Sequence, residues 1–217
     1  MHTKLVPIVS KARTLKVILK WWWTHHNKRL PDAVVVEGPK AGGHIGFKVT
    51  DEYPDPKDDP ENDLGKLVKG VKTAIDEFFK EHGIDKAKYH VPIIAAGGIY
   101  TGEDIEWIRR QGADAVQLGT LFVTTFECDA DIGFKQTYLD AEEDDLVVIK
   151  SPVGMPGRAL RNKFLDDVAD PKIRTSLPNC PVHCIKSCAQ DKAPYCIFTA
   201  LVNAQRGKFR YGFAFAG

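Results

Sequence analysis

Hydrophobic residues in the first half of the chain gather in short runs that alternate with longer amphipathic stretches. Four runs are β-rich and nearly continuous in apolar residues: Leu5–Val9, Ala33–Val36, Pro92–Ala96 and Ala115–Leu118. Continuous hydrophobicity is typical of parallel strands covered on both faces, because a strand with one face in water alternates polar and apolar residues. We therefore predict four buried strands at these positions.

The stretches between these strands have helical spacing. The first helix is predicted from apolar residues at i, i+3, i+4 and i+7: Leu15, Ile18, Leu19 and Trp22. Leu64–Glu81 follows the second strand with its apolar residues on one helical face, and Thr101–Gln111 follows the third. Thr101 is a suitable N-cap, and Asp104 suits the positive end of the helix dipole. The order β-α-β-α-β-α-β predicts a parallel α/β sheet.

The rest of the chain lacks this alternation. Val147–Val153 is a candidate extended segment, and Pro194–Gln205 has a helical pattern that Gly207 would end. The closing run YGFAFAG is small and aromatic, so we expect it to pack rather than extend into solvent. Residues 1–127 are predicted as βα units, and residues 128–217 as a helical and loop extension packed on them.

Two stretches have the composition of loops. Asp51–Asp63 is acidic and proline-rich, which indicates a surface loop. After the C-terminal end of a strand, such a loop could be an active-site lid or a solvated connection. The run SPVGMPGR at Ser151–Arg158 is also predicted as a loop. Lys150 and Arg158 flank it, where they could contact a phosphate or an acyl-carrier substrate, or lie in solvent.

Composition and charge narrow the class of protein. The chain has 217 residues, 43% hydrophobic and 27% charged, which fits a soluble globular domain with or without an appendage. Lys plus Arg is 30 and Asp plus Glu is 29, and this balance excludes a strong field for nucleic acid or acidic membranes. The opening run MHTKLVPIV is too short for a signal peptide or a membrane span, so we expect a cytoplasmic protein.

The run EGPKAGGHIG at Glu37–Gly46 carries candidate chemistry. It follows a predicted strand directly, and the C-terminal ends of the strands form the catalytic face of a βα barrel. Gly42 and Gly43 allow the backbone to approach a flat ligand, and His44 can exchange a proton near neutral pH. The alternative is a glycine-rich turn that contains a hydrogen-bonded histidine.

Two later strand ends are candidate phosphate-binding turns. The first, AAGGI, would direct its last three amides outward at the start of a helix. The second, QLGT, offers further backbone amides and a threonine hydroxyl. The candidate residues of both turns are Gly97, Gly98, Ile99, Gln117, Gly119 and Thr120. Glycine turns at successive strand ends match the phosphate site of many βα barrels, and the alternative is two tight turns.

Four cysteines lie close together near the end of the chain. Cys180, Cys184 and Cys188 repeat every fourth residue, and Cys196 follows. On a helix this spacing places thiols near one face, where a metal or an iron–sulfur cluster could bind. The spacing is not of the CxxC type, however, so we predict reduced thiols and assign no metal ligand.

Three motifs together resemble the nitronate monooxygenase family, also called 2-nitropropane dioxygenase-like. They are EGPKAGGHIGF, VPIIAAGGI with GADAVQLGT, and SPVGMPGR, and the resemblance runs from Leu5 to the closing FAFAG. It implies a TIM (β/α)8 barrel with non-covalent FMN, in which residues 1–127 match βα units five to eight. The chain would then be the C-terminal half of that barrel with its extension.

The resemblance also implies roles for the candidate residues. His44 matches the family's active-site histidine, which acts near the flavin as a base or a hydrogen-bond donor to the substrate. The phosphate would lie on the two glycine turns, and Gly42, Gly43 and Gln117 would lie near the flavin or its ribityl chain. The implied reaction is oxidation of alkyl nitronates with O2 to a carbonyl compound and nitrite.

Two other functions stay open at this point. One is an NAD(P)H-dependent FMN reductase of enoyl thioesters, because the family shades into such enzymes. The other is an inactive fragment or a half-barrel that works only after assembly. Four parallel strands would leave Leu5–Val9 and Ala115–Leu118 as apolar edges without partners. We therefore expect the missing N-terminal half or a second subunit to complete the barrel.

Overall fold

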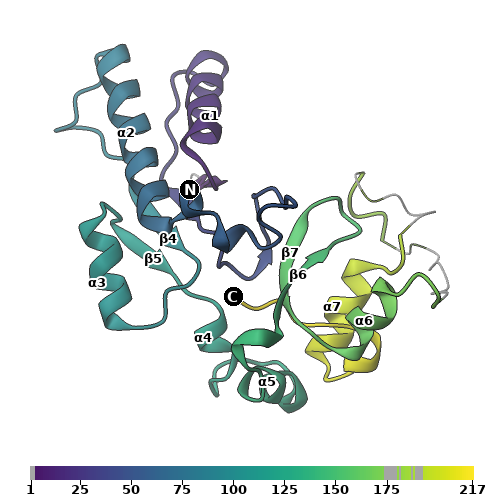
Figure 1. The fold of residues 1–217 in the computed structure, drawn as a ribbon. Coiled ribbons are helices and arrows are strands. Elements are labelled where there is room, and N and C mark those ends of the chain that lie inside the picture. The colour runs from purple at the N-terminus through teal and green to yellow at the C-terminus, as the bar shows by residue number, and fades with distance from the viewer. Residues whose placement is uncertain (1–2, 174–179, 181, 187, 189–192) are drawn as a thin grey trace. The chain divides into compact units, whose positions relative to one another are not determined.

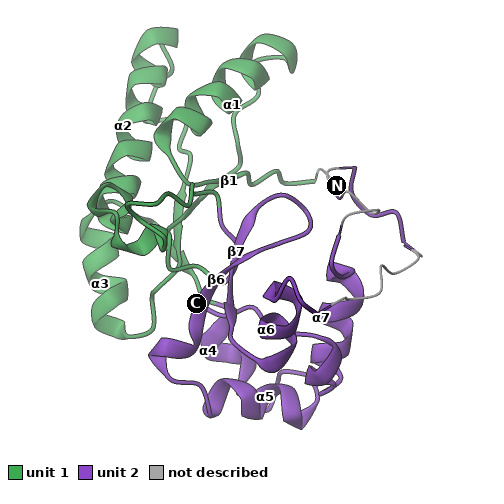
Figure 2. Ribbon diagram, turned by 45° about the vertical axis from the view of Figure 1, so that its right-hand side comes forward, with its two compact units in different colours: residues 1–41, 46–118 green, residues 42–45, 119–217 purple. Residues whose placement is uncertain are grey.

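The computed structural model describes residues 3–173, 180, 182–186, 188 and 193–217 (Figure 1). The chain forms two compact units, which Figure 2 shows in different colours. The first comprises residues 1–41 and 46–118, and the second comprises residues 42–45 and 119–217. The short segment Gly42–Ile45 therefore leaves the first unit and belongs to the second.

A parallel sheet forms the centre of the first unit. Its strands are β1 (Ile8–Val9), β2 (Val34–Glu37), β4 (Ile93–Ala96) and β5 (Ala115–Gln117), in the order β1-β2-β4-β5. All three pairings are parallel, which confirms the predicted parallel α/β sheet. The strand β1 is shorter than predicted. Among the described residues, the outer strands β1 and β5 each pair on one side only.

The helices of the first unit begin and end close to their predicted bounds. They are α1 (Ala12–His25), α2 (Leu64–His82) and α3 (Gly102–Arg110). The helix α2 contacts α1, β2 and β4, and it buries one apolar face that includes Val68 and Val71. Thr101 and Asp104 form the predicted cap of α3, because each side chain accepts a hydrogen bond from the other residue's amide.

The acidic stretch after β2 is more structured than a solvated loop. It contains two 3₁₀ turns, Pro56–Asp58 and Pro60–Asn62. The buried Asn62 side chain donates a hydrogen bond to the Pro56 carbonyl at 3.0 Å. Asp63 then caps α2 by accepting from the Lys66 amide. Internal hydrogen bonds thus fix the second half of this stretch, which the sequence predicted as an open surface loop.

An antiparallel sheet forms part of the second unit. Its strands are β3 (Gly43–His44), β6 (Leu146–Lys150) and β7 (Pro156–Leu160), in the order β3-β7-β6. The extended segment predicted at Val147–Val153 corresponds to β6. The loop predicted at Ser151–Arg158 is wrong in its second half, because Pro156–Arg158 belong to β7 and only the turn between β6 and β7 is a loop.

Short helices complete the second unit. They are α4 (Thr120–Val123), α5 (Ile132–Leu139), α6 (Lys163–Ala169) and α7 (Ile197–Gln205), with 3₁₀ turns at Glu143–Asp145 and Phe209–Tyr211. Helix α7 ends where predicted, before Gly207 at φ +72°. It begins at Ile197, later than the predicted start at Pro194. The closing run packs as expected: Phe213 and Ala214 are buried, and the Leu160 amide bonds the Ala214 carbonyl at 2.9 Å.

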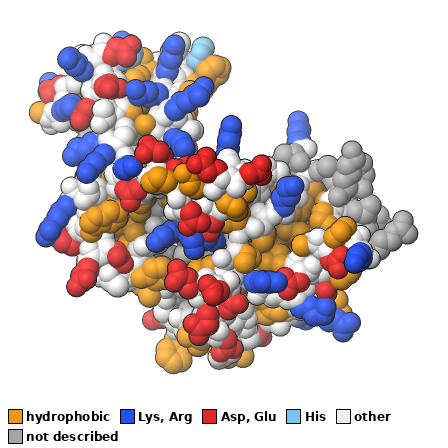
Figure 3. Space-filling model, viewed as in Figure 1, with side chains coloured by type: hydrophobic (Ala, Val, Ile, Leu, Met, Phe, Trp, Pro, Cys, Tyr) orange, Lys and Arg blue, Asp and Glu red, His pale blue; other side chains and the backbone are white. Residues whose placement is uncertain are grey.

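Charged side chains of both signs are interspersed over the face shown in Figure 3. This pattern agrees with the net charge of +1. None of the described helices is both long and apolar enough to cross a membrane.

Candidate functional site

The backbone of β3 holds His44 in the second unit. Gly43 pairs with Arg158 and His44 pairs with Gly157, so β3 is an edge strand beside β7. The Ile45 amide extends this contact by donating to the Pro156 carbonyl at 3.0 Å. A side chain at Gly157 would approach the Phe215 ring to 3.0 Å and the Gly43 carbonyl to 3.3 Å, so a glycine there allows the close contact.

The His44 side chain has two neighbours from distant parts of the sequence. Its Nε2 shares a hydrogen bond of 2.7 Å with Ser151 Oγ, and its ring meets the Phe215 ring edge-on at a centroid distance of 5.1 Å. Ser151 is buried, and it lies at the end of β6. The imidazole is therefore held on two sides. Sequence reasoning missed Ser151, whose only signal was its place in the SPVGMPGR motif.

Burial lowers the pKa of His44 below its usual value of 6.5. The imidazole is therefore neutral at pH 7. A neutral imidazole with one nitrogen bonded to a hydroxyl can exchange a proton through its other nitrogen. His44 thus has the protonation state that a general base or a neutral hydrogen-bond donor requires.

The two glycines before His44 have different surroundings. A side chain at Gly42 would meet the backbone of Ala216 at 2.7 Å, so this glycine allows the C-terminal segment to pack closely. Gly43 has φ +92°, and no atom lies within 4 Å of the place where a side chain would begin. Gly43 therefore leaves room for an approaching group, and Gly42 has a packing role.

The first predicted phosphate turn is a left-handed bend in the first unit. Gly97 has φ +96° and Gly98 has φ +71°. A side chain at Gly97 would meet the Ala41 amide nitrogen at 2.7 Å, and one at Gly98 would meet the Lys40 side chain at 2.9 Å. Ile99 is buried. The bend precedes the Thr101 cap, so both glycines are needed for the backbone itself, whatever they bind.

The residues of the second predicted turn are more open. Gln117 ends β5 and is exposed. Gly119 precedes α4 at φ −125°, with no atom within 4 Å of a side-chain position. The Thr120 hydroxyl accepts a hydrogen bond from the Gly217 amide at 3.2 Å. The packing of the chain does not require a glycine at 119, which is compatible with a role in binding.

Glu37 is a second residue to which the sequence assigned no role. It ends β2 at the carboxyl edge of the parallel sheet, and it is half-buried. Burial raises the pKa of its carboxyl group. A carboxyl group of this kind at a strand end is a candidate for binding or proton transfer. The signal was present in the sequence, as an acidic residue directly after a buried strand.

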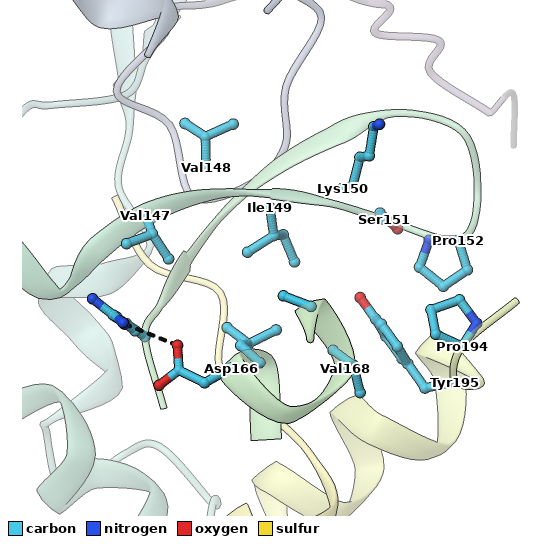
Figure 4. A pocket seen from close by; sticks show the side chains of 13 residues that line it. Val147, Val148, Ile149, Lys150, Ser151, Pro152, Asp166, Val168, Pro194 and Tyr195 are labelled. Atoms are coloured by element: carbon cyan, nitrogen blue, oxygen red, sulfur yellow. Dashed lines mark hydrogen bonds and ion pairs between the residues drawn. The ribbon is translucent and has the colours of Figure 1, made fainter. Parts of the chain in front are cut away.

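A cavity of about 590 Å³ lies in the second unit, and Ser151 is one of the residues that line it. Residues of β6 and α6 line it together with Pro194 and Tyr195, and Figure 4 shows the Tyr195 hydroxyl pointing into it. Lys150 lies at this cavity. Arg158 does not line it: it lies on β7 and is only 2% exposed, which corrects the alternative that it lies in a solvated loop.

Tyr195 contributes a hydroxyl group and an aromatic ring, and two substitutions separate their effects on stability. Its hydroxyl is buried and has no hydrogen-bond partner in the part of the chain that the structure describes. Because an unpaired buried hydroxyl contributes no net stability, Tyr195→Phe is expected to change the free energy of unfolding by less than about 1 kcal/mol or to raise it. Tyr195→Ala should cost about 3–5 kcal/mol, since it removes the ring from the core. Urea denaturation of both variants measures this, and equal losses would contradict it.

The sequence matches the family model of nitronate monooxygenase over residues 1–213. A relative from Saccharomyces cerevisiae that is named for nitronate monooxygenase is 36% identical over 138 residues, which are 63% of this chain and 32% of the relative. Among solved structures, FabK from Thermotoga maritima is 25% identical at a TM-score of 0.64, covering 99% of this chain and 53% of its own. Nitroalkane oxidase from Streptomyces ansochromogenes is 26% identical at a TM-score of 0.50, and the match covers 76% of this chain and 40% of that protein.

The chain spans about a third of the yeast relative and about half of FabK. The family and its named relatives are oxidoreductases, and the resemblance drawn from the three motifs is confirmed over nearly the whole chain. This chain belongs to the nitronate monooxygenase family.

Proposed function

We propose that this chain is part of an FMN-dependent enzyme that oxidises alkyl nitronates with O2 to a carbonyl compound and nitrite. The observation that carries the proposal is the neutral, half-buried His44 held at 2.7 Å by Ser151. Family membership supports the same class of reaction.

Two glycines leave room for a flavin. Gly43 and Gly119 each have open space where another residue would carry a side chain, so a planar or anionic group could approach their backbone. We propose that FMN contacts the following residues: Gly42, Gly43, Gly97, Gly98, Ile99, Gln117, Gly119 and Thr120. When bound, FMN would supply the electron-accepting chemistry of the reaction.

The proposed work of the protein is to place and polarise the substrate. His44 would hold the nitronate by a hydrogen bond, or take a proton from the carbon next to the nitro group of a neutral nitroalkane. Ser151 is a positioning residue, because it touches His44 and fixes the direction of the imidazole. The Phe215 ring covers one side of the imidazole and limits its access to water.

We propose further that additional strands complete a (β/α)8 barrel around the parallel sheet. Both outer strands have exposed residues. Ile8 of β1 is 58% exposed, and two of the three residues of β5 are exposed, whereas the inner strand β2 is largely buried. Size-exclusion chromatography and flavin absorbance of the 217 residues alone test this. We expect association or little bound flavin, because the proposed additional strands would supply part of the site. A monomeric chain that retains stoichiometric FMN would contradict it.

A second candidate is an NAD(P)H-dependent reductase of enoyl thioesters. The observation that favours it is the FabK structure, which covers 99% of this chain, against 76% for nitroalkane oxidase. Stopped-flow mixing of the flavin-loaded protein with NAD(P)H separates the two candidates. We expect slow bleaching of the flavin absorbance by NAD(P)H. Bleaching within the turnover time of the enzyme would favour the reductase.

A further inference from the structure

Four thiols surround one small cavity in the second unit, apart from His44 and its neighbours. The cavity has a volume of about 20 Å³, and four of the eight residues that line it are cysteines: Cys180, Cys184, Cys188 and Cys196. Its other walls are apolar, apart from Tyr195. All five cysteines of the chain are free thiols, so no disulfide accounts for the arrangement.

The cysteines are not brought together by a helix. The described residues 180, 182–186 and 188 form no helix, although the spacing of three cysteines would place them along one helical face. The Cys188 amide donates a hydrogen bond to the Ile185 carbonyl at 3.4 Å. Cys196 comes from a second segment, at the position that precedes α7. The four thiols therefore converge from two separate segments.

Backbone amides already face two of the four sulfur atoms. The His183 amide donates to Cys180 Sγ at 3.3 Å. Cys196 Sγ accepts hydrogen bonds from Thr199 and from the Phe198 amide. Amides that donate to sulfur stabilise thiolates, and they commonly surround metal-bound cysteines.

We propose that Cys180, Cys184, Cys188 and Cys196 bind a thiophilic metal as a four-thiolate site. Four cysteines are the ligand set of structural zinc ions and of iron–sulfur clusters, whereas oxygen-seeking cations are not bound in this way. The small cavity offers room for about one ion. No group of three His, Cys, Asp or Glu within the described ranges is already placed to hold a metal ion, so the thiols must close in as the metal binds.

The chain offers a matched control. Cys128 is a free, half-buried thiol that lies outside this cavity. Cys184 is the most exposed of the four, which makes Cys184→Ser the substitution least disturbing to packing. Comparison of Cys184→Ser with Cys128→Ser separates loss of a ligand from loss of any thiol.

The experiment measures the metal content of the full chain, purified under anaerobic reducing conditions and then incubated with Zn²⁺ or, separately, with Fe³⁺, sulfide and excess dithiothreitol, which reduces part of the iron. We expect about one zinc, or about four irons with four acid-labile sulfides, per chain. The zinc and iron arms distinguish a single ion from a cluster. Cys184→Ser should lose most of the metal, and Cys128→Ser should keep it.

Alkylation of thiols provides a readout that does not depend on how a variant folds. In the metal-loaded wild-type chain, iodoacetamide should label Cys128 and spare the other four cysteines until a chelator is added. The proposal is overturned if neither metal binds above about a tenth of an equivalent, or if Cys184→Ser and Cys128→Ser bind equally. It is also overturned if the four thiols form disulfides or react as fast as Cys128 after metal loading.

Discussion

Replacing His44 with Ala is expected to lower kcat for nitronate oxidation by about 10²–10⁴-fold, the usual contribution of a positioned acid–base group. The imidazole is held by Ser151 at 2.7 Å, and burial keeps it neutral by lowering its pKa below 6.5. The variant loses this group but none of the proposed flavin contacts, so FMN should stay bound. Steady-state kinetics and flavin absorbance of the FMN-loaded protein measure both quantities.

The pH profile gives a second readout for the same group. Because burial lowers the pKa of His44, its base form persists below pH 6.5. The decrease of kcat/KM on the acid side of the pH profile should therefore have its midpoint below pH 6.5.

Ser151→Ala should lower kcat by about tenfold, the value of one hydrogen bond, without loss of FMN. The exposed His90, which pairs with Asp114, is the matched control, and His90→Ala should leave turnover unchanged. Full activity of His44→Ala would remove His44 from the mechanism.

Gly97→Ala is expected to destabilise the chain by about 2–6 kcal/mol. Gly97 has φ +96°, where an L-residue is strained by about 1–3 kcal/mol. The added methyl group would also meet the Ala41 amide nitrogen at 2.7 Å, and overpacking of this kind costs about 1–3 kcal/mol more. Because the obstacle is backbone, it cannot rotate away. Chemical denaturation monitored by circular dichroism measures the loss.

Gly119→Ala is the control for this prediction. Gly119 has φ −125° and open space around it, so a methyl group should change the free energy of unfolding by less than about 1 kcal/mol. If the two variants were equally stable, the left-handed turn at Gly97 would not have the strained contact described.

Much of the parallel sheet could be predicted because its signals are local. The run of valines in β2 is buried as a strand with both faces covered, and α2 buries the face that its periodicity indicates. The cap of α3 rests on two residues, Thr101 and Asp104, that lie three positions apart. Such patterns depend on neighbours along the chain, so the sequence shows them directly.

The contacts of His44 could not be predicted in the same way. Ser151 lies 107 positions away, and β3 forms only because β7 lies beside it. Gly43 and His44 have no strand pattern of their own, and Pro156–Arg158 has the composition of a loop. The cysteines are a further case: their spacing does not show where they lie, whereas the structure places all four at one cavity, with Cys196 at the residue before α7.

The most direct test of the central claim is anaerobic mixing of the flavin-loaded protein with an alkyl nitronate. We predict rapid loss of the flavin absorbance, its return when O2 is admitted, and release of nitrite. His44→Ala, with its FMN retained, should show a rate of bleaching lower by about 10²-fold or more. A flavin that stays oxidised in the presence of nitronate, or that bleaches equally fast in the wild type and His44→Ala, would contradict the account.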